Sequence, residues 1–101
     1  MHALSGYLEF PADQRDLTLA ALRDVCARSR QDAGCVDYWW AEDVDQPNRF
    51  RFFECWETKE AFDAHSAQPY EEAFMADHVS RITGFDAHTL DIAGRASVLG
   101  D

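Results

Sequence analysis

His65 has a side chain suited to moving a proton, and its position in the sequence gives it two possible roles. It lies on a predicted helix, 59–66, on the same stripe as Ala61 and Phe62. An imidazole changes charge near neutral pH, so His65 is a candidate general base. A histidine in the last turn of a helix can instead interact with the terminal carbonyl groups. If His65 is a base, its replacement by alanine should leave the melting temperature nearly unchanged.

Tyr70 is the second candidate for chemistry. It opens the next predicted helix, one turn before Phe74, and its hydroxyl can donate a hydrogen bond to a substrate oxygen. Packing of the ring, with the hydroxyl in water, is the other interpretation. His78 lies one turn after Phe74 and has the same ambiguity as His65.

The large aromatic residues are candidates for the walls of a binding site. Residues of this type belong to a core more often than to a cleft, but one or two of them should line any cavity. The candidates are Trp56, Phe74, Trp39 and Trp40.

Glu54 is an unusual carboxylate, because it lies between Phe52 and Trp56 on a predicted strand. Buried acids are usually paired, so a structural role is favoured over one in which Glu54 orients a histidine. The histidines lack HxxxH and HxH spacing, and the chain has no GxGxxG or P-loop motif. We therefore expect no metal, no nucleotide and no other cofactor.

Composition limits the classes of partner. The 101 residues suit one domain, predicted at 1–92 with a tail at 93–101, and the net charge of −10 disfavours nucleic acids and anionic membranes. No apolar run approaches the roughly 20 residues that span a bilayer, and the N-terminus does not resemble a signal peptide. The three cysteines have no paired spacing, as expected for reduced thiols in a cytoplasmic protein.

The elements that must position these side chains follow from the hydrophobic pattern. Strands are predicted at 2–10, 35–42, 49–57 and 85–92, and helices at 13–31, 59–66 and 69–81. Asp13 and Thr58 are the expected N-caps, and Gly34 is expected to end the first helix in a left-handed conformation. The order β-α-β-β-α(α)-β predicts an α+β, ferredoxin-like split βαβ fold, with a four-stranded antiparallel sheet and its helices on one face.

Both faces of this sheet are predicted to be apolar. Alternation places Tyr38 and Trp40 of the second strand on one face of the sheet and Trp39 on the other. On the third strand, Phe52 and Phe53 likewise point to opposite faces. Helices cover only one face, so the other would expose a large apolar patch. We therefore expect a homodimer in which this second face is buried.

The segments GCVDYWW and DQPNRFRFFECWETKEAFDAHSAQPYEEAF resemble the antibiotic biosynthesis monooxygenase family of the dimeric α+β barrel superfamily. The resemblance is clear from Gly34 to Phe74. It implies a homodimer around a central barrel, with a ligand cleft between the sheet and helices of each subunit. Members include quinol and anthrone oxygenases, haem degraders and proteins of unknown role.

The resemblance implies a cofactor-independent monooxygenase that acts with molecular oxygen on a small phenolic, quinol or polycyclic aromatic compound. His65 would then be the base or proton relay, and Tyr70 a donor to the substrate. Substrate-binding positions would be Trp56, Phe74, His78 and Trp39. The alternative is a non-catalytic binding or accessory protein on the same scaffold, with its cleft plugged by side chains or holding a ligand without turnover.

Haem degradation is disfavoured by the same comparison. The haem-degrading members of the family share a pattern of three residues. These are an Asn on the first strand, a Trp late in the second helix and a His ten residues after that Trp. This chain has Gly6, His65 and Met75 near those positions.

Overall fold

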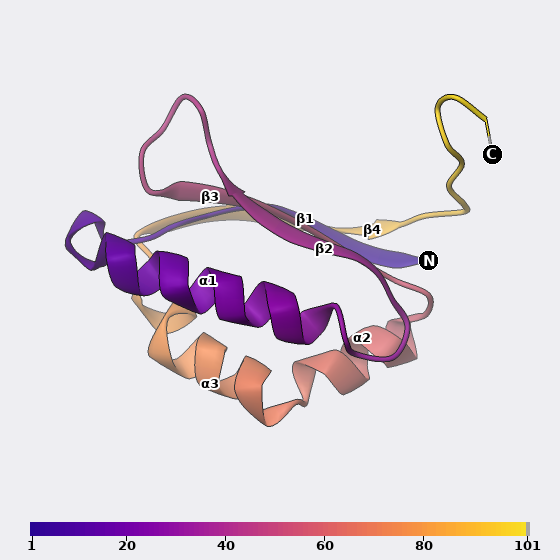
Figure 1. Cartoon of the computed structure of the whole chain (residues 1–101), viewed down its shortest axis with the longest axis horizontal. Coiled ribbons are helices and arrows are strands. Elements are labelled where there is room, and N and C mark those ends of the chain that lie inside the picture. The colour runs from indigo at the N-terminus through magenta and orange to yellow at the C-terminus, as the bar shows by residue number, and fades with distance from the viewer. Residues whose placement is uncertain (101) are drawn as a thin grey trace.

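The computed structural model describes residues 1–100 as one antiparallel sheet covered by helices on a single face (Figure 1). The strands are β1 (His2–Glu9), β2 (Cys35–Glu42), β3 (Arg49–Trp56) and β4 (Gly84–Asp91), and the helices are α1 (Arg15–Ser29), α2 (Lys59–Ser66) and α3 (Pro69–Asp77). Short 3-10 turns lie at Ala12–Gln14 and Val79–Arg81. The sheet order is β2-β3-β1-β4, which confirms the predicted ferredoxin-like plan.

Most predicted boundaries are correct to within two residues, and the exceptions have local causes. α1 begins at Arg15 after a 3-10 turn, so Asp13 provides no side-chain cap, and the N-cap position is Gln14. α3 ends at Asp77 rather than at 81, because the chain leaves helical geometry at His78 and tightens into a 3-10 turn. These shifts leave the order of elements unchanged.

The start of α2 is set by the predicted cap. The Thr58 hydroxyl accepts a hydrogen bond from the Ala61 backbone N–H at 3.1 Å. Pro69 then occupies the first turn of α3, where its missing N–H costs nothing. Gly34 has a φ of 81°, as expected, but it lies in the turn that enters β2, five residues after the end of α1. A Cβ at Gly34 would lie 2.6 Å from that of Ala61, so the approach of α2 to this turn requires glycine.

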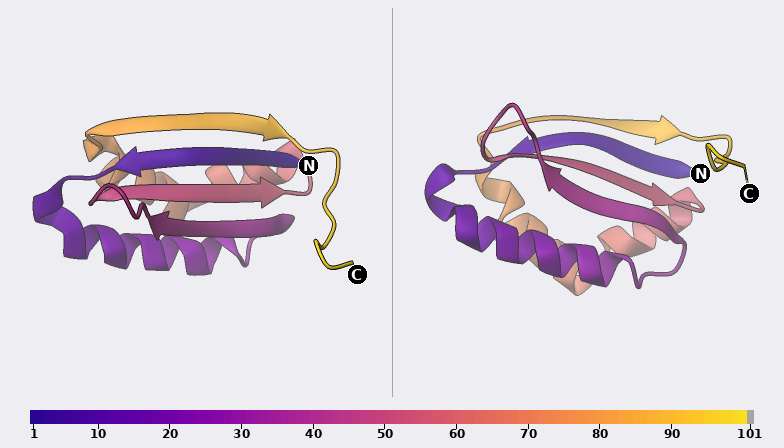
Figure 2. Two further views of the ribbon diagram at one scale, coloured as in Figure 1. Left: turned by 90° about the horizontal axis from the view of Figure 1, so that it is seen from above. Right: turned by 45° about the horizontal axis from the view of Figure 1, so that its top comes forward.

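The core lies between the helices and the covered face of β1, β2 and β3. Strand alternation sends Leu8, Phe50 and Phe52 toward α1 and α3, where they pack with Val25 and Phe74. The edge strand β4 takes no part in this core, because all of its residues except Gly84 are exposed (Figure 2).

The opposite face of the sheet carries no helix. Trp39 packs against Phe53 there, with 6.3 Å between ring centroids, and Trp39 remains 39% exposed. The β2–β3 loop and the segment that follows β4 both rise on this side of the sheet (Figure 1). The face is therefore open, and its character is mixed, because Arg49 and Arg51 lie over the Tyr7 ring on the same side of the sheet as Phe53.

None of the helices within residues 1–100 is long and apolar enough to cross a membrane. Cys26, Cys35 and Cys55 are all free thiols in the described chain.

Candidate active site

A cavity of about 380 Å³ lies between the covered face of the sheet and helices α2 and α3. Cavities of roughly 300–1,000 Å³ are usual for small-molecule sites. Apolar and aromatic side chains form most of its wall, with a few polar groups among them. The lining residues are Leu4, Leu8, Tyr38, Trp40, Phe52, Glu54, Phe62, His65, Ser66, Glu71, Phe74, Met75 and Val79.

Two carboxylates enter this apolar space, Glu54 from β3 and Glu71 from α3. Glu54 pairs across the sheet with Tyr38 on one side and Leu4 on the other, so register places it in the middle of the floor. Its Oε1 accepts a hydrogen bond from the indole N–H of the buried Trp56 at 3.0 Å. Burial raises the pKa of the Glu54 carboxyl, and the hydrogen bond from Trp56 acts in the opposite direction.

Glu71 is the less well paired of the two acids. Its Oε2 is buried and accepts no hydrogen bond, and the nearest basic atom is His65 Nε2 at 3.5 Å. Burial is the main reason that the pKa of Glu71 rises to about 7, and the nearby charges of Glu54 and Asp32 raise it further. Glu71 can therefore give or take a proton near neutral pH.

The His65 ring is held in place by contacts to its Nδ1 atom and to one of its faces. Its Nδ1 lies 2.9 Å from Asp32 Oδ2 and 3.1 Å from the Tyr70 hydroxyl, and Tyr70 in turn donates a hydrogen bond to Asp32. The ring stacks on Trp56 with 4.5 Å between centroids. An Nδ1–H that donates to Asp32 leaves Nε2 directed at Glu71, so Asp32, His65 and Glu71 form a chain that ends in the cavity.

Among the residues that line the cavity, His65 is the one basic side chain beside the two acids, since neither lysine nor arginine is present there. Burial raises the pKa of the Tyr38 phenol, with the charges of Glu54 and Glu71 acting in the same direction, so Tyr38 is a neutral hydrogen-bonding group here. No group of three or more His, Cys, Asp or Glu side chains within residues 1–100 is arranged to hold a metal ion.

The side chains predicted for the site are divided among several places in the structure. His65 and Phe74 line the cavity. Trp56 is fully buried behind His65, and the Tyr70 hydroxyl contacts Asp32 and Ser29 rather than the cavity.

His78 and Trp39 lie elsewhere. His78 packs on the outer side of Phe74 and borders a separate depression between α1 and α3. Trp39 is on the open face of the sheet, as strand alternation requires for a neighbour of Trp40.

Asp32 and Glu71 are the functional residues that the sequence analysis missed. Acids in the first turn of a helix ordinarily complement the helix dipole, and Glu71 fits that description. One signal was present, because Glu71 lies three and four residues before Phe74 and Met75, on the stripe that faces the sheet. Asp32 lies in a turn, where no periodicity marks it.

The burial of His65 changes the expected effect of its removal. The side chain is 2% exposed, so alanine would leave a cavity beside Trp56 and would remove one of the hydrogen-bond partners of Asp32. We expect His65→Ala to lower the free energy of unfolding by about 2–4 kcal/mol, whatever its effect on catalysis. Urea unfolding measures this, with His88→Ala on the exposed strand β4 as the matched control, expected within about 0.5 kcal/mol of the parent. An equally small loss in His65→Ala would contradict the described packing.

The fold and the cavity together define an α+β domain with an acid-containing cavity under its sheet. Residues 1–77 match the sequence pattern of the family described as antibiotic biosynthesis monooxygenase, and the chain belongs to this family. An uncharacterized protein from Synechocystis sp. is 31% identical over 72 residues, which cover 71% of this chain and 49% of that protein. The chain thus spans about half the length of this curated relative.

Solved structures show the same fold at low identity. A Deinococcus radiodurans protein that bears the family name has a TM-score of 0.86 and 23% identity, covering 99% of this chain and 100% of that one. The Mycobacterium tuberculosis protein Rv0793 has a TM-score of 0.84 and 23% identity, covering 95% of this chain and 98% of the other. At 23% identity, the similarity to these two structures shows a shared fold and nothing beyond it.

Proposed function

We propose that this chain is a cofactor-independent monooxygenase that oxidises a small, uncharged phenolic or quinol compound with molecular oxygen. The observation that carries the proposal is the buried Glu71 carboxylate, which faces an open apolar cavity and is backed by His65 and Asp32. Membership of the monooxygenase family supports the reaction type. A plugged cleft would have favoured the non-catalytic alternative, and the cavity of about 380 Å³ does not favour it.

Proton removal is the first requirement of the reaction. A phenol passes an electron to oxygen readily only as its anion, so a base must lie within reach of the hydroxyl. Glu71 has a raised pKa of about 7 and can accept this proton. The negative charge then moves from the carboxylate to the substrate, so the cavity gains no net charge. His65 stands behind Glu71 as a proton relay, and Asp32 and Tyr70 fix its ring.

The later steps conserve atoms and electrons. The substrate anion gives one electron to O2, and the resulting pair combines to form a C–O bond to a ring carbon. The proton held by Glu71 goes to the distal peroxide oxygen, and the O–O bond then breaks as the oxygenated ring carbon loses its hydrogen as a proton. That second proton completes the water that leaves, and the ring carbon becomes a carbonyl carbon. For a hydroquinone, the sum is hydroquinone + O2 → hydroxyquinone + H2O. Apolar walls such as Phe52, Phe62 and Phe74 keep bulk water from the anion.

The charge of the cavity predicts which substrates it rejects. A hydroquinone that carries a carboxylate would place a further anion beside Glu54 and Glu71, and no lysine or arginine lines the cavity to offset it. We expect 1,4-naphthohydroquinone to support oxygen uptake with a kcat/KM at least about 10-fold above that of its 2-carboxylate, which corresponds to about 1.4 kcal/mol. Measured rates corrected for autoxidation test this expectation, and a preference for the carboxylate would contradict it.

We also propose that two copies pair through the open faces of their sheets. The aromatic pair Trp39 and Phe53 and the exposed edge strand β4 support this proposal. Domain limits at 1–92 and 93–101 remain a proposal as well. No regular element follows Asp91 within residues 1–100, and Val98 and Leu99 are 99% and 95% exposed.

A further inference from the structure

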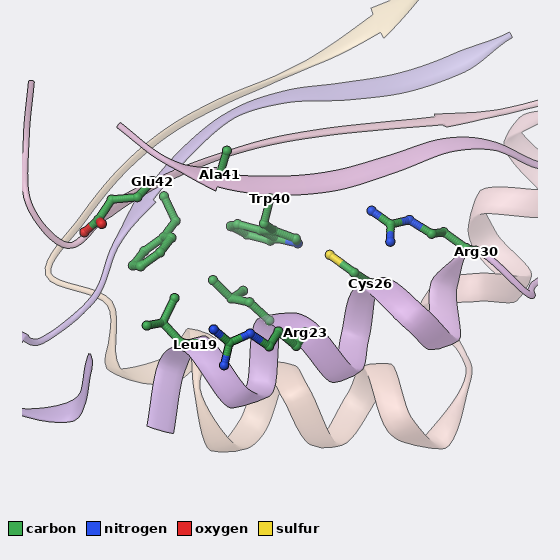
Figure 3. A pocket seen from close by; sticks show the side chains of 9 residues that line it. Leu19, Arg23, Cys26, Arg30, Trp40, Ala41 and Glu42 are labelled. Carbon is green, nitrogen blue, oxygen red and sulfur yellow. The ribbon is translucent and has the colours of Figure 1, made fainter. Parts of the chain in front are cut away.

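A second hollow lies between α1 and β2, on the far side of Trp40 from the cavity already described. It has a volume of about 360 Å³ and is open to solvent along the edge of the sheet (Figure 3). Its apolar floor is formed by Leu19, Leu22, Trp40 and Phe50. We refer to it as the α1–β2 groove.

Two arginines give this groove a charge opposite to that of the cavity. Arg23 on α1 and Arg30, the residue after α1, both line it, and Figure 3 shows the Arg30 guanidinium beside the Trp40 indole and that of Arg23 below it, on α1. Arg23 makes no ion pair or side-chain hydrogen bond with any residue from 1 to 100. Arg30 donates its Nε–H to the Tyr38 carbonyl at 2.9 Å, which leaves its terminal nitrogens for another acceptor.

The one acid in the groove is already neutralised. Glu42 accepts two hydrogen bonds from Arg15, one of them at 2.7 Å, and a third from the Asn48 backbone N–H at 3.0 Å. These contacts, with the hydrogen bond from Arg15 as the main cause, lower the pKa of Glu42 to about 2. In a chain of net charge −10, the groove is thus a local site of unpaired positive charge.

Trp40 offers an aromatic surface between the two arginines. The Trp40 ring packs against Phe52, with 4.7 Å between ring centroids, and the Trp40 Nε1–H donates a hydrogen bond to the Tyr38 hydroxyl at 3.2 Å. These two contacts fix the orientation of the indole. A fixed aromatic ring flanked by guanidinium groups suits a flat ring that bears an anion.

We propose that the α1–β2 groove is a second ligand site, which binds a small planar aromatic carboxylate with its ring on Trp40 and its carboxylate on Arg23 or Arg30. The groove would then take an anionic compound and the acidic cavity an uncharged one, on the two sides of one tryptophan. This inference does not depend on the oxygenase reaction, since it concerns binding, and the two arginines that carry it lie outside that cavity.

The test compares two probes of equal shape. Titration calorimetry of the full chain with 2-naphthoate and with uncharged 2-naphthamide should show at least a 10-fold tighter binding of the carboxylate. Arg23→Gln should reduce that preference, and Arg23→Gln/Arg30→Gln should abolish it. The matched control is Arg28→Gln on the same helix, which lies outside the groove and pairs with Asp24, and which should keep the full preference.

Arg30 supports the sheet edge through Tyr38, so the double variant needs a check of folding by thermal unfolding. If the double variant is unfolded, the single variants Arg23→Gln and Arg30→Gln take its place, and a preference that neither of them reduces overturns the proposal. Equal affinity for the two probes, no binding of 2-naphthoate at millimolar concentration, or a preference that persists in Arg23→Gln and in the folded double variant would each overturn the proposal.

Discussion

Replacing Glu71 with glutamine is expected to lower oxygen uptake by about 10²–10⁴-fold, the usual cost of losing a general base. Glutamine keeps the shape of the side chain but cannot accept the substrate proton. In the parent protein, kcat should rise with pH through an ionisation near the pKa of about 7 and then level off. The matched control is Glu72→Gln, in the same turn of α3 but exposed, which should keep full activity. Full activity in Glu71→Gln would remove the proposed base.

The same variant makes a separate prediction about stability. The folded-state pKa of Glu71 is raised from 4.5 to about 7, so between these pH values the folded protein holds a proton that the unfolded chain has released. Its contribution to stability is therefore present below pH 4.5 and is lost as the pH rises through about 7. Glu71→Gln should be more stable than the parent at pH 8, and the difference should shrink toward pH 4. Chemical unfolding at the two pH values measures this, and a less stable variant at pH 8 would contradict the description of Glu71 as a buried, poorly paired acid.

Replacing Trp39 with aspartate is expected to convert the proposed dimer into a monomer. Trp39 stands on the open face of the sheet, where it is 39% exposed in the isolated chain and would be buried by a second copy. Truncation of a buried interface tryptophan commonly costs at least about 2 kcal/mol, and an unpaired aspartate in its place adds a desolvation penalty. Light scattering at micromolar concentration should therefore report two chains for the parent protein and one for the variant.

Leu17→Asp is the control for this experiment. Leu17 is 52% exposed on α1, on the opposite side of the sheet, so the same chemical change there should leave a dimer intact. A folded parent protein that is monomeric at micromolar concentration would contradict the proposal, and so would a Trp39→Asp variant that stays dimeric.

Local sequence signals predicted most of the fold. Thr58 and Pro69 marked the starts of α2 and α3, and strand alternation separated Trp39 from Tyr38 and Trp40, all as the structure shows. Asp13 misled the prediction of α1, because a suitable residue type does not reveal that a 3-10 turn comes first. Boundaries of this kind depend on the path by which the chain enters the helix, and packing against neighbouring elements sets that path.

The site was less predictable, because its chemistry depends on which groups become neighbours. His65 was identified, but its partner Asp32 is 33 residues away in the chain and meets it only when α2 packs beside the turn after α1. The raised pKa of Glu71 is likewise a property of burial near Glu54, which no spacing encodes. Tyr70 and His65 are five residues apart, and the structure joins their side chains through Asp32 rather than through a ligand.

The most direct test of the proposed function is the fate of the oxygen atoms. The protein, treated with a chelator and free of flavin, is incubated with 1,4-naphthohydroquinone under 18O2, and the product is analysed by mass spectrometry. Monooxygenation predicts a hydroxynaphthoquinone that carries one 18O atom, formed much faster with the parent protein than with Glu71→Gln or without protein. A product without 18O, accompanied by hydrogen peroxide at the uncatalysed rate, would contradict the proposed function.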